Sequence, residues 1–333
     1  MQFLDWKWLR PSLWLSLSAI LLFSLSLDDV STLQRLVTLS LCSLSLFNGY
    51  IEYLVSAVFI SPGNAKASAS GEHWTSQYGM FKGVKLHVQT FASHPDQPLA
   101  IVIHGWRSTS ASVVDRAQWF VDRDWNVVMI ELPGHGQSTP IPRWNAITTA
   151  GHVQHHLQNI HDFIEVSKSS PVFLYGHSMG GYLCSRLASM ESPTLPFTIT
   201  GVILESPLML YSHILEEICQ HLWIPKFLRP LHLKRLYRDV QSMHPGVVPA
   251  PSLEQFDIPH WGLPNAPTLC LQAKHDNRLG QAHSDALESR WNTEHELILH
   301  RIEGLTHSGA RVNDERNRLL GNWLQTFDSL EVS

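Results

Sequence analysis

Short, continuously apolar runs alternate with amphipathic stretches along this chain after residue 72. The runs lie at 100–103, 126–130, 172–175, 202–204, 268–271 and 296–302. Apolar runs of this kind are typical of strands buried on both faces of a parallel sheet. The stretches between them predict helices at about 111–123, 147–167, 179–190, 280–292 and 311–327. Alternating strands and helices predict an α/β fold with a doubly wound, mostly parallel sheet.

Ser178 lies in a glycine-rich turn, GHSMGG at residues 176–181, between a predicted strand and a predicted helix. A serine in G-x-S-x-G between a strand and a helix occupies a tight, strained turn that exposes its hydroxyl as a nucleophile. Flanking glycines permit the strained backbone and the close approach of strand and helix. The helix N-terminus also offers N–H groups to a developing oxyanion. Ser178 is therefore the predicted nucleophile.

At these residues the chain resembles the α/β-hydrolase superfamily, over about residues 75–328. It is most similar to the lysophospholipase and monoacylglycerol-lipase-like branch, often labelled serine aminopeptidase-like. Residues 104–106, HGW, look like the family's HG-x oxyanion loop, and the resemblance implies that the backbone N–H groups of Trp106 and Met179 form the oxyanion hole. Residues 131–138, ELPGHGQS, resemble a D-x-P-G-H-G-x-S turn, with Glu131 replacing the usual aspartate in what we expect to be a structural role.

The resemblance also implies a base and an acid for the nucleophile. His307 lies just beyond the last predicted strand, where this family places its histidine. The family order Ser, then Asp or Glu, then His requires the acid to precede it. Asp276 follows a predicted strand in a segment that resembles the family's acid loop, and its carboxylate would orient His307. Glu205 is the rival acid, because some members place the acid after the preceding strand.

Other histidines carry weaker predictions. We expect His104 and His177 to support the site without transferring protons, and His275 to be a poor base because adjacent residues point apart. His152 and His156 have a spacing that could bind a metal, but no third ligand can be placed, and a solvated polar helix face is expected. No nucleotide, flavin or metal motif occurs, so neither a cofactor nor a metal is predicted.

The composition limits the class of partner and hints at the compartment. A net charge of -5 with only 16% charged residues argues against a nucleic-acid-binding protein. The four cysteines are widely scattered, with no CxxC pair and no zinc spacing. We therefore expect buried free thiols, as in a reducing compartment.

Two apolar stretches open the chain, at residues 11–27 and 36–60. A membrane-spanning helix needs about 20 apolar residues, so the first stretch is short and the second is long enough. A cleaved signal peptide would need a better cut site than this serine-rich segment provides. The sequence favours a two-helix membrane hairpin, and a single anchor with a buried or in-plane second helix stays open.

Basic residues suggest how this region is oriented. Lys7 and Arg10 precede the first stretch, and Lys66, Lys82 and Lys85 follow the second. The positive-inside rule then predicts that both ends, and the hydrolase domain with them, are cytoplasmic. The expected organisation is a membrane anchor at 1–62, a linker at 63–72 and an α/β-hydrolase domain at 73–333.

The connection between the predicted strand that ends at Glu205 and the one that starts near Thr268 is unusually long. Residues 208–265 form an insertion of about 58 residues, against about 2–6 in an ordinary α/β connection. In this superfamily such an insertion is the helical cap over the active site. Residues 226–238 within it hold five basic and no acidic side chains. They indicate either a packed cap with a solvated basic face or a segment that lies against anionic lipid.

These features predict a membrane-anchored serine hydrolase that cleaves carboxylic esters, such as lipid or lysophospholipid esters, through an acyl-enzyme. The predicted triad is Ser178, Asp276 and His307. The same triad would serve a thioesterase or an acyltransferase, and the sequence does not separate these activities. A catalytically idle hydrolase fold acting as a membrane-bound interaction protein is the alternative of another class, and the intact triad positions argue against it.

Overall fold

The computed structural model describes residues 6–26, 30–63, 66–189, 195–244, 253–309 and 311–328. The chain divides into two compact units. The sheet unit consists of Pro62–Ile141, Asn145–Ser212 and Glu254–Ser333, and the hairpin unit of Met1–Ser61, Pro142–Trp144 and His213–Leu253. Residues 27–29, at the end of the first predicted apolar stretch, and residues 64–65 of the predicted linker lie outside the described residues.

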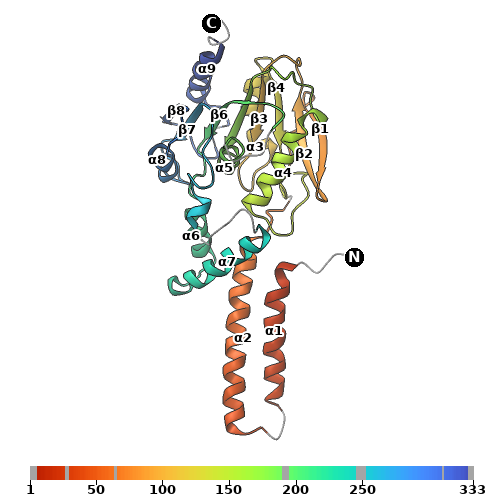
Figure 1. The fold of residues 1–333 in the computed structure, drawn as a ribbon, viewed down its shortest axis with the longest axis vertical. Coiled ribbons are helices and arrows are strands. Elements are labelled where there is room, and N and C mark those ends of the chain that lie inside the picture. Colours follow the sequence, from red (N-terminus) through yellow and green to blue (C-terminus); the bar gives the residue numbers. More distant parts are fainter. Residues whose placement is uncertain are drawn as a thin grey trace. The chain divides into compact units, whose positions relative to one another are not determined.

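An eight-stranded sheet with the order β1-β2-β4-β3-β5-β6-β7-β8 forms the centre of the sheet unit (Figure 1). The strands are β1 Thr75–Phe81, β2 Val84–Phe91, β3 Leu99–Ile103, β4 Asn126–Ile130, β5 Val172–His177, β6 Ile199–Glu205, β7 Thr268–Ala273 and β8 Leu297–Ile302. Strand β2 pairs antiparallel with β1 and β4, and the other neighbours are parallel. The predicted α/β fold with a mostly parallel sheet is confirmed.

The β1–β2 hairpin was not predicted from the sequence. Its strands are joined by Lys82 and Gly83, which both have positive φ, +48° and +76°. Two such residues suit the tight turn of a β-hairpin. Strand β1 is an edge strand of exposed and half-buried residues, so it lacks the continuous apolar run that marks the buried strands.

Helices connect the parallel strands, and one more helix follows the last strand. The connecting helices are α3 Ser110–Val121, α4 Ala146–Gln158, α5 Met179–Leu187 and α8 Ala282–Ser289, and the helix after β8 is α9 Asp314–Asp328. Four of them lie within a few residues of the predicted bounds, but α4 ends at Gln158, well before the predicted end at residue 167. A short 3₁₀ turn, Ile160–Asp162, follows it. All four cysteines are buried free thiols, as predicted.

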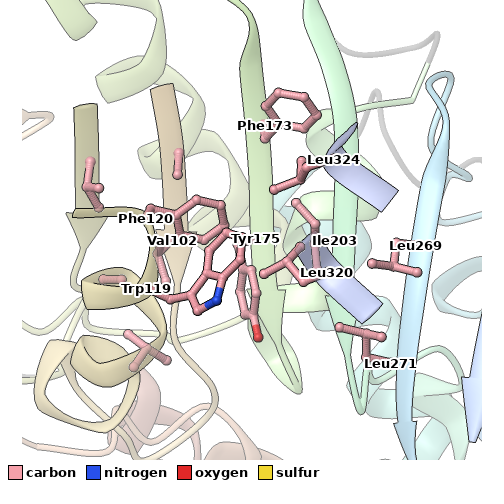
Figure 2. Packing of buried hydrophobic residues seen from close by; sticks show 14 of the residues in the cluster. Val102, Trp119, Phe120, Phe173, Tyr175, Ile203, Leu269, Leu271, Leu320 and Leu324 are labelled. Carbon is pink, nitrogen blue, oxygen red and sulfur yellow. The ribbon is translucent and has the colours of Figure 1, made fainter. Parts of the chain in front are cut away.

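An apolar core lies between the sheet and helices α3 and α9 (Figure 2). Trp119 and Phe120 of α3 and Leu320 of α9 pack against Tyr175 and Ile203 of the central strands. Full burial of one large apolar side chain stabilises a fold by about 1.5–3 kcal/mol. The core therefore holds the strands rigidly, and with them the strand ends where the unusual polar residues gather.

The hairpin unit contains the two N-terminal helices and most of the predicted cap. Its helices are α1 Trp6–Ser24, α2 Thr32–Val58, α6 Tyr211–His221, which begins in the sheet unit, and α7 Arg229–Met243. Helices α1 and α2 lie side by side (Figure 1). Ser45 donates a hydrogen bond to the Trp14 carbonyl at 2.8 Å, and a Cβ on Gly49 would lie 3.1 Å from Trp14 Cβ. The small residues of α2 thus allow close packing.

Helix α2 is long and apolar enough to cross a membrane, whereas the apolar part of α1, Trp8–Ser24, is shorter. A buried core helix or a signal sequence would meet the same criteria of length and composition. Both helices carry large exposed apolar side chains, among them Leu13, Ile20, Phe23, Leu33, Leu36, Leu41, Leu44 and Phe47. These exposed apolar faces are consistent with a membrane anchor.

Candidate active site

Ser178 lies between β5 and α5 in a strained backbone conformation, with φ +55° and ψ -117°. Close backbone contacts require glycine at positions 176 and 180, on either side of the serine. A Cβ on Gly176 would lie 2.5 Å from the backbone of Gly180, and one on Gly180 would lie 2.0 Å from the carbonyl oxygen of Ile103. Since real Cβ atoms do not approach so closely, only glycine allows β5, β3 and α5 to meet here. The turn thereby holds the Ser178 side chain at the end of the strand.

Three predicted site residues form a continuous hydrogen-bonded chain. The Ser178 hydroxyl lies 3.0 Å from Nε2 of His307. Nδ1 of His307 lies 2.8 Å from Oδ2 of Asp276. Asp276 follows β7, and His307 lies in the loop after β8, so neighbouring strand ends bring them together. With Nδ1–H donating to the carboxylate, Nε2 is left to accept the serine proton.

Asp276 is held as an anion by its surroundings. Burial acts to raise its pKa, but the hydrogen bond with His307 and the backbone N–H groups of Leu279 and Arg278 outweigh burial and lower the pKa to about 2. The two N–H groups donate to Oδ1 at 2.9 and 2.8 Å. At neutral pH the carboxylate can therefore stabilise a His307 imidazolium as it forms.

Glu205, the rival acid, is engaged elsewhere. Its carboxylate accepts hydrogen bonds from Nε and Nη2 of Arg116, at 2.8 and 2.5 Å, and from the Tyr175 hydroxyl. Arg316 lies 3.5 Å away. Burial raises the pKa of Glu205, but the Arg116 guanidinium outweighs it and holds the pKa well below the usual range. The structure thus brings Asp276 to His307 and places Glu205 in a buried ion cluster.

The predicted oxyanion loop lies against the serine. A Cβ on Gly105 would be only 3.2 Å from Ser178 Cβ. His104 secures this loop, since its Nδ1 lies 2.8 Å from the Gly105 carbonyl and its Nε2 accepts the Leu132 N–H at 3.1 Å. Burial lowers the pKa of His104, which keeps the imidazole neutral. Trp106 follows directly in this loop.

The ELPGHGQS turn is organised by the carboxylate of Glu131. It accepts hydrogen bonds from the hydroxyl of Ser110 at 2.7 Å and from the Gln137 N–H at 2.8 Å, and it pairs with His87 at 2.9 Å. Burial raises the pKa of Glu131, but the hydrogen bonds from His87 and Ser110 lower it to about 2. These contacts give Glu131 the structural role expected from the sequence.

His177 makes a contact that no sequence pattern indicated. Its Nε2 lies 2.6 Å from the backbone carbonyl oxygen of His307, and its Nδ1 would lie 3.4 Å from a Cβ on Gly105. Burial, and secondly the charge of Arg116, lower the pKa of His177 to about 4. His177 is therefore neutral and supports both loops. His275 is mostly exposed and pairs with Glu303 at 3.3 Å.

The expectation of a solvated face for His152 and His156 is wrong. Both side chains are buried. His152 packs edge-on against Phe81, and His156 stacks on Phe163, so these rings fill space under the β1 side of the sheet. Within the described residues, no group of three or more His, Cys, Asp or Glu side chains is placed to hold a metal ion.

Comparison with known proteins agrees with the fold. The family model described as serine aminopeptidase, S33 matches residues 94–246. Phospholipase YtpA of Bacillus subtilis (strain 168) is 30% identical over 123 residues, which cover 34% of this chain and 42% of that protein. Putative esterase/lipase 2 of Mycoplasma genitalium is 30% identical over 108 residues, covering 32% and 37%. The match thus spans less than half the length of these relatives.

A solved structure shares the architecture. α/β hydrolase domain-containing protein 10 from mouse matches 77% of this chain and 99% of its own, with a TM-score of 0.55 and 15% identity. The chain therefore has the α/β-hydrolase fold. The family that it matches is that of the serine aminopeptidases, S33, which confirms the resemblance found in the sequence motifs.

Proposed function

We propose that this α/β hydrolase is a serine ester hydrolase in which Ser178 is the nucleophile, His307 the general base and Asp276 the acid that orients the base. The main support is the hydrogen-bonded chain from Ser178 through His307 to Asp276, with distances of 3.0 and 2.8 Å. A serine hydroxyl needs an adjacent base to become a nucleophile. The depressed pKa of Asp276 adds the anion that such a base requires.

The proposed reaction has two halves. Ser178 Oγ attacks the ester carbonyl carbon while His307 Nε2 takes the hydroxyl proton. The tetrahedral intermediate collapses, the carbon–oxygen bond to the alcohol breaks, and His307 returns the proton to that alcohol. Water, deprotonated by His307, then attacks the acyl carbon. The bond from that carbon to Ser178 Oγ breaks, His307 returns the proton to Oγ, and the acid leaves. In both halves the oxyanion lies against the backbone N–H groups of Trp106 and Met179.

The oxyanion assignment is supported by position. Met179 is the first residue of α5, where N–H groups have no partner within the helix. The loop carrying Trp106 approaches Ser178 closely through Gly105. Removing one such donor costs roughly 10²–10³-fold in kcat.

Labelling with a fluorophosphonate tests the nucleophile. The probe forms a covalent bond with an activated serine, so wild type should be labelled and Ser178→Ala should not. Ser169→Ala is the matched control, because Ser169 is an exposed serine outside the site. Equal labelling of wild type and Ser178→Ala would refute the assignment.

The proposed substrate is a lipid ester, such as a lysophospholipid or an acylglycerol. Relatives named phospholipase and esterase/lipase support ester hydrolysis. The apolar helices α1 and α2, with α2 long enough to cross a bilayer, support an N-terminal membrane anchor that keeps the enzyme at lipid. A panel of lysophospholipids, acylglycerols, acyl thioesters and short soluble esters, run on wild type and Ser178→Ala, would define the class. Preference for thioesters would favour a thioesterase.

We further propose a cytoplasmic hydrolase domain, on the positive-inside rule. A tag at the C-terminus of the full chain should then be cleaved when protease reaches the cytoplasmic face of sealed vesicles. The same tag should be protected when protease reaches only the opposite face. Cleavage from the opposite side alone would overturn this topology.

A further inference from the structure

Polar side chains join helix α7 to the two N-terminal helices. Asp239 of α7 accepts a hydrogen bond from Arg10 of α1. Arg235, one turn earlier on α7, donates to the carboxylate of Glu52 at 3.1 Å and to the side-chain oxygen of Asn48 at 2.5 Å, both on α2. Arg10 also lies 3.9 Å from Glu52. These contacts fix α7 to one end of the helix pair.

This polar cluster defines an edge on the hairpin unit. Beyond it, α1 and α2 present exposed apolar side chains along their length, from Leu13 to Phe23 and from Leu33 to Phe47. Charged side chains are expensive within lipid, so a bilayer that surrounds the apolar part would end at the level of Arg10 and Glu52. Helix α7, which is paired with these residues, then lies at the membrane surface.

The connection between α6 and α7, residues 222–228, exposes two large aromatic side chains. Trp223 is 89% exposed and Phe227 is 80% exposed. Trp223 also has a positive φ of +55°, at the end of α6, where glycine is usual because a Cβ is disfavoured in this conformation. Both aromatic side chains thus lie on the surface of the hairpin unit.

The structure divides the five cations of residues 226–238 into two that are paired and three that are exposed. Of the five cations in 226–238, Arg229 pairs with Glu216 and Arg235 with Glu52. The remaining cations, which are exposed, are Lys226, Lys234 and Arg238. Aromatic rings flanked by lysine and arginine are the pattern found at membrane interfaces.

We propose that residues 222–228 form a second membrane contact, in which Trp223 and Phe227 enter the headgroup region of the bilayer and the exposed cations of 226–238 face anionic lipid. The contact rests on the membrane anchor of the proposed function and adds a specific lipid-facing surface to it. With α7 fixed to the hairpin, two separate points of attachment would hold the hairpin unit at the bilayer. Of the five cations predicted in residues 226–238, only three would then face lipid, beside Trp223 and Phe227.

Depth-dependent fluorescence tests this contact without requiring catalysis. A Phe227→Cys variant of the full chain, labelled with a polarity-sensitive dye, is reconstituted in vesicles of phosphatidylcholine and phosphatidylglycerol. The native cysteines are buried, and wild type treated with the same dye in parallel measures their background labelling. The dye should emit at shorter wavelength and be quenched by nitroxides placed near the headgroups. Emission as in water, with full quenching by aqueous iodide, would overturn the proposal.

Two controls separate the loop from the anchor. Leu41→Cys on α2 should report lipid, and Val312→Cys, an exposed apolar position of the sheet unit, serves as the position of similar exposure outside the loop. Leu41 in lipid with Phe227 in water would refute the loop contact alone, whereas Leu41 in water would refute the anchor and the loop together. A blue-shifted Phe227 dye that no nitroxide lipid quenches would indicate cover by protein and would also refute the lipid contact.

Activity gives a second readout. Trp223→Ser combined with Phe227→Ser should lower hydrolysis of a vesicle-borne ester by roughly tenfold, because two large apolar groups lose their burial. Hydrolysis of a short soluble ester should stay unchanged. If the double variant hydrolysed the vesicle-borne ester as fast as wild type, the proposal would be contradicted. Loss of fluorophosphonate labelling in Ser178→Ala reports on the proposed catalytic serine separately.

Discussion

The imidazole Nε2 of His177 lies 2.6 Å from the carbonyl oxygen of His307. The residue before the proposed nucleophile thus donates a hydrogen bond to the backbone of the proposed base. Since burial keeps His177 neutral, it acts as a fixed donor that links the serine turn to the loop after β8. The distance between Ser178 and His307 therefore depends on a side chain that does not itself transfer protons.

We expect His177→Leu to lower kcat by roughly 10²-fold with little change in KM, because small displacements of a reacting group cost about this much. His177→Gln keeps a donor at a similar reach and should restore part of the rate. Steady-state kinetics on a soluble ester, with circular dichroism to confirm folding, would measure this. An unchanged kcat in His177→Leu would show that the bond does not position His307.

Asp276→Asn should lower kcat by roughly 10³–10⁴-fold while the protein stays folded. An asparagine carries no charge to stabilise the imidazolium and favours the wrong imidazole tautomer. The measurement is kcat/KM on one ester, together with the rate of fluorophosphonate labelling. A loss of less than tenfold would mean that another group supplies the charge.

Glu205→Gln should act on stability and leave the chemistry nearly intact. The substitution leaves Arg116 and Arg316 buried without their carboxylate, and breaking a buried pair costs about 3–5 kcal/mol. Urea unfolding should show this loss in the free energy of unfolding, while kcat per folded molecule stays close to wild type. A loss of kcat comparable to that of Asp276→Asn would instead make Glu205 the acid.

Gly180→Ala should disrupt the serine turn, because the added Cβ would lie 2.0 Å from the Ile103 carbonyl oxygen. Overpacking of this kind costs about 1–3 kcal/mol or more, and fluorophosphonate labelling should be lost. Gly151→Ala is the matched control. Its Cβ would meet nothing within 4 Å in helix α4, so a gain of about 0.5–1 kcal/mol is expected. The measurement is thermal unfolding of both variants. Equal stability of Gly180→Ala and Gly151→Ala would contradict this prediction.

The fold should lose stability in mild acid. Burial lowers the pKa of His177 to about 4 and that of His135 to about 3, from an ordinary value of 6.5. The unfolded chain then binds more protons below pH 6.5, so the stabilisation present above that pH is lost as the pH falls toward 4. For His177 the loss is on the order of 3 kcal/mol.

Urea unfolding between pH 7.5 and about pH 4 would measure this loss of stability. His177→Gln should flatten the dependence on pH, whereas replacing the exposed His275 with glutamine should not. An unfolding free energy that did not change over this range would contradict the assigned cause.

Local patterns were sufficient for the buried strands and for the serine turn. Continuous apolar runs require burial on both faces, and the glycines beside Ser178 are required by backbone contact at Gly176 and Gly180. The edge strand β1 is exposed to half-buried and lacked such a pattern, and in β2 buried polar residues such as His87 and Gln89 interrupt the apolar run. The resemblance to the α/β hydrolases placed His307 just beyond the last predicted strand, and in the structure it lies in the loop after β8.

What the sequence by itself determined is which side chains stand at the strand ends; which of them meet was decided by tertiary structure. Glu205 and Asp276 both follow parallel strands, and only the positions of Arg116 and His307 in space separate a structural carboxylate from the proposed catalytic one. The same holds for Arg235, whose partner Glu52 is 183 residues away. Periodicity and spacing report local backbone geometry, whereas hydrogen bonds and ion pairs depend on distances that only the packed chain establishes.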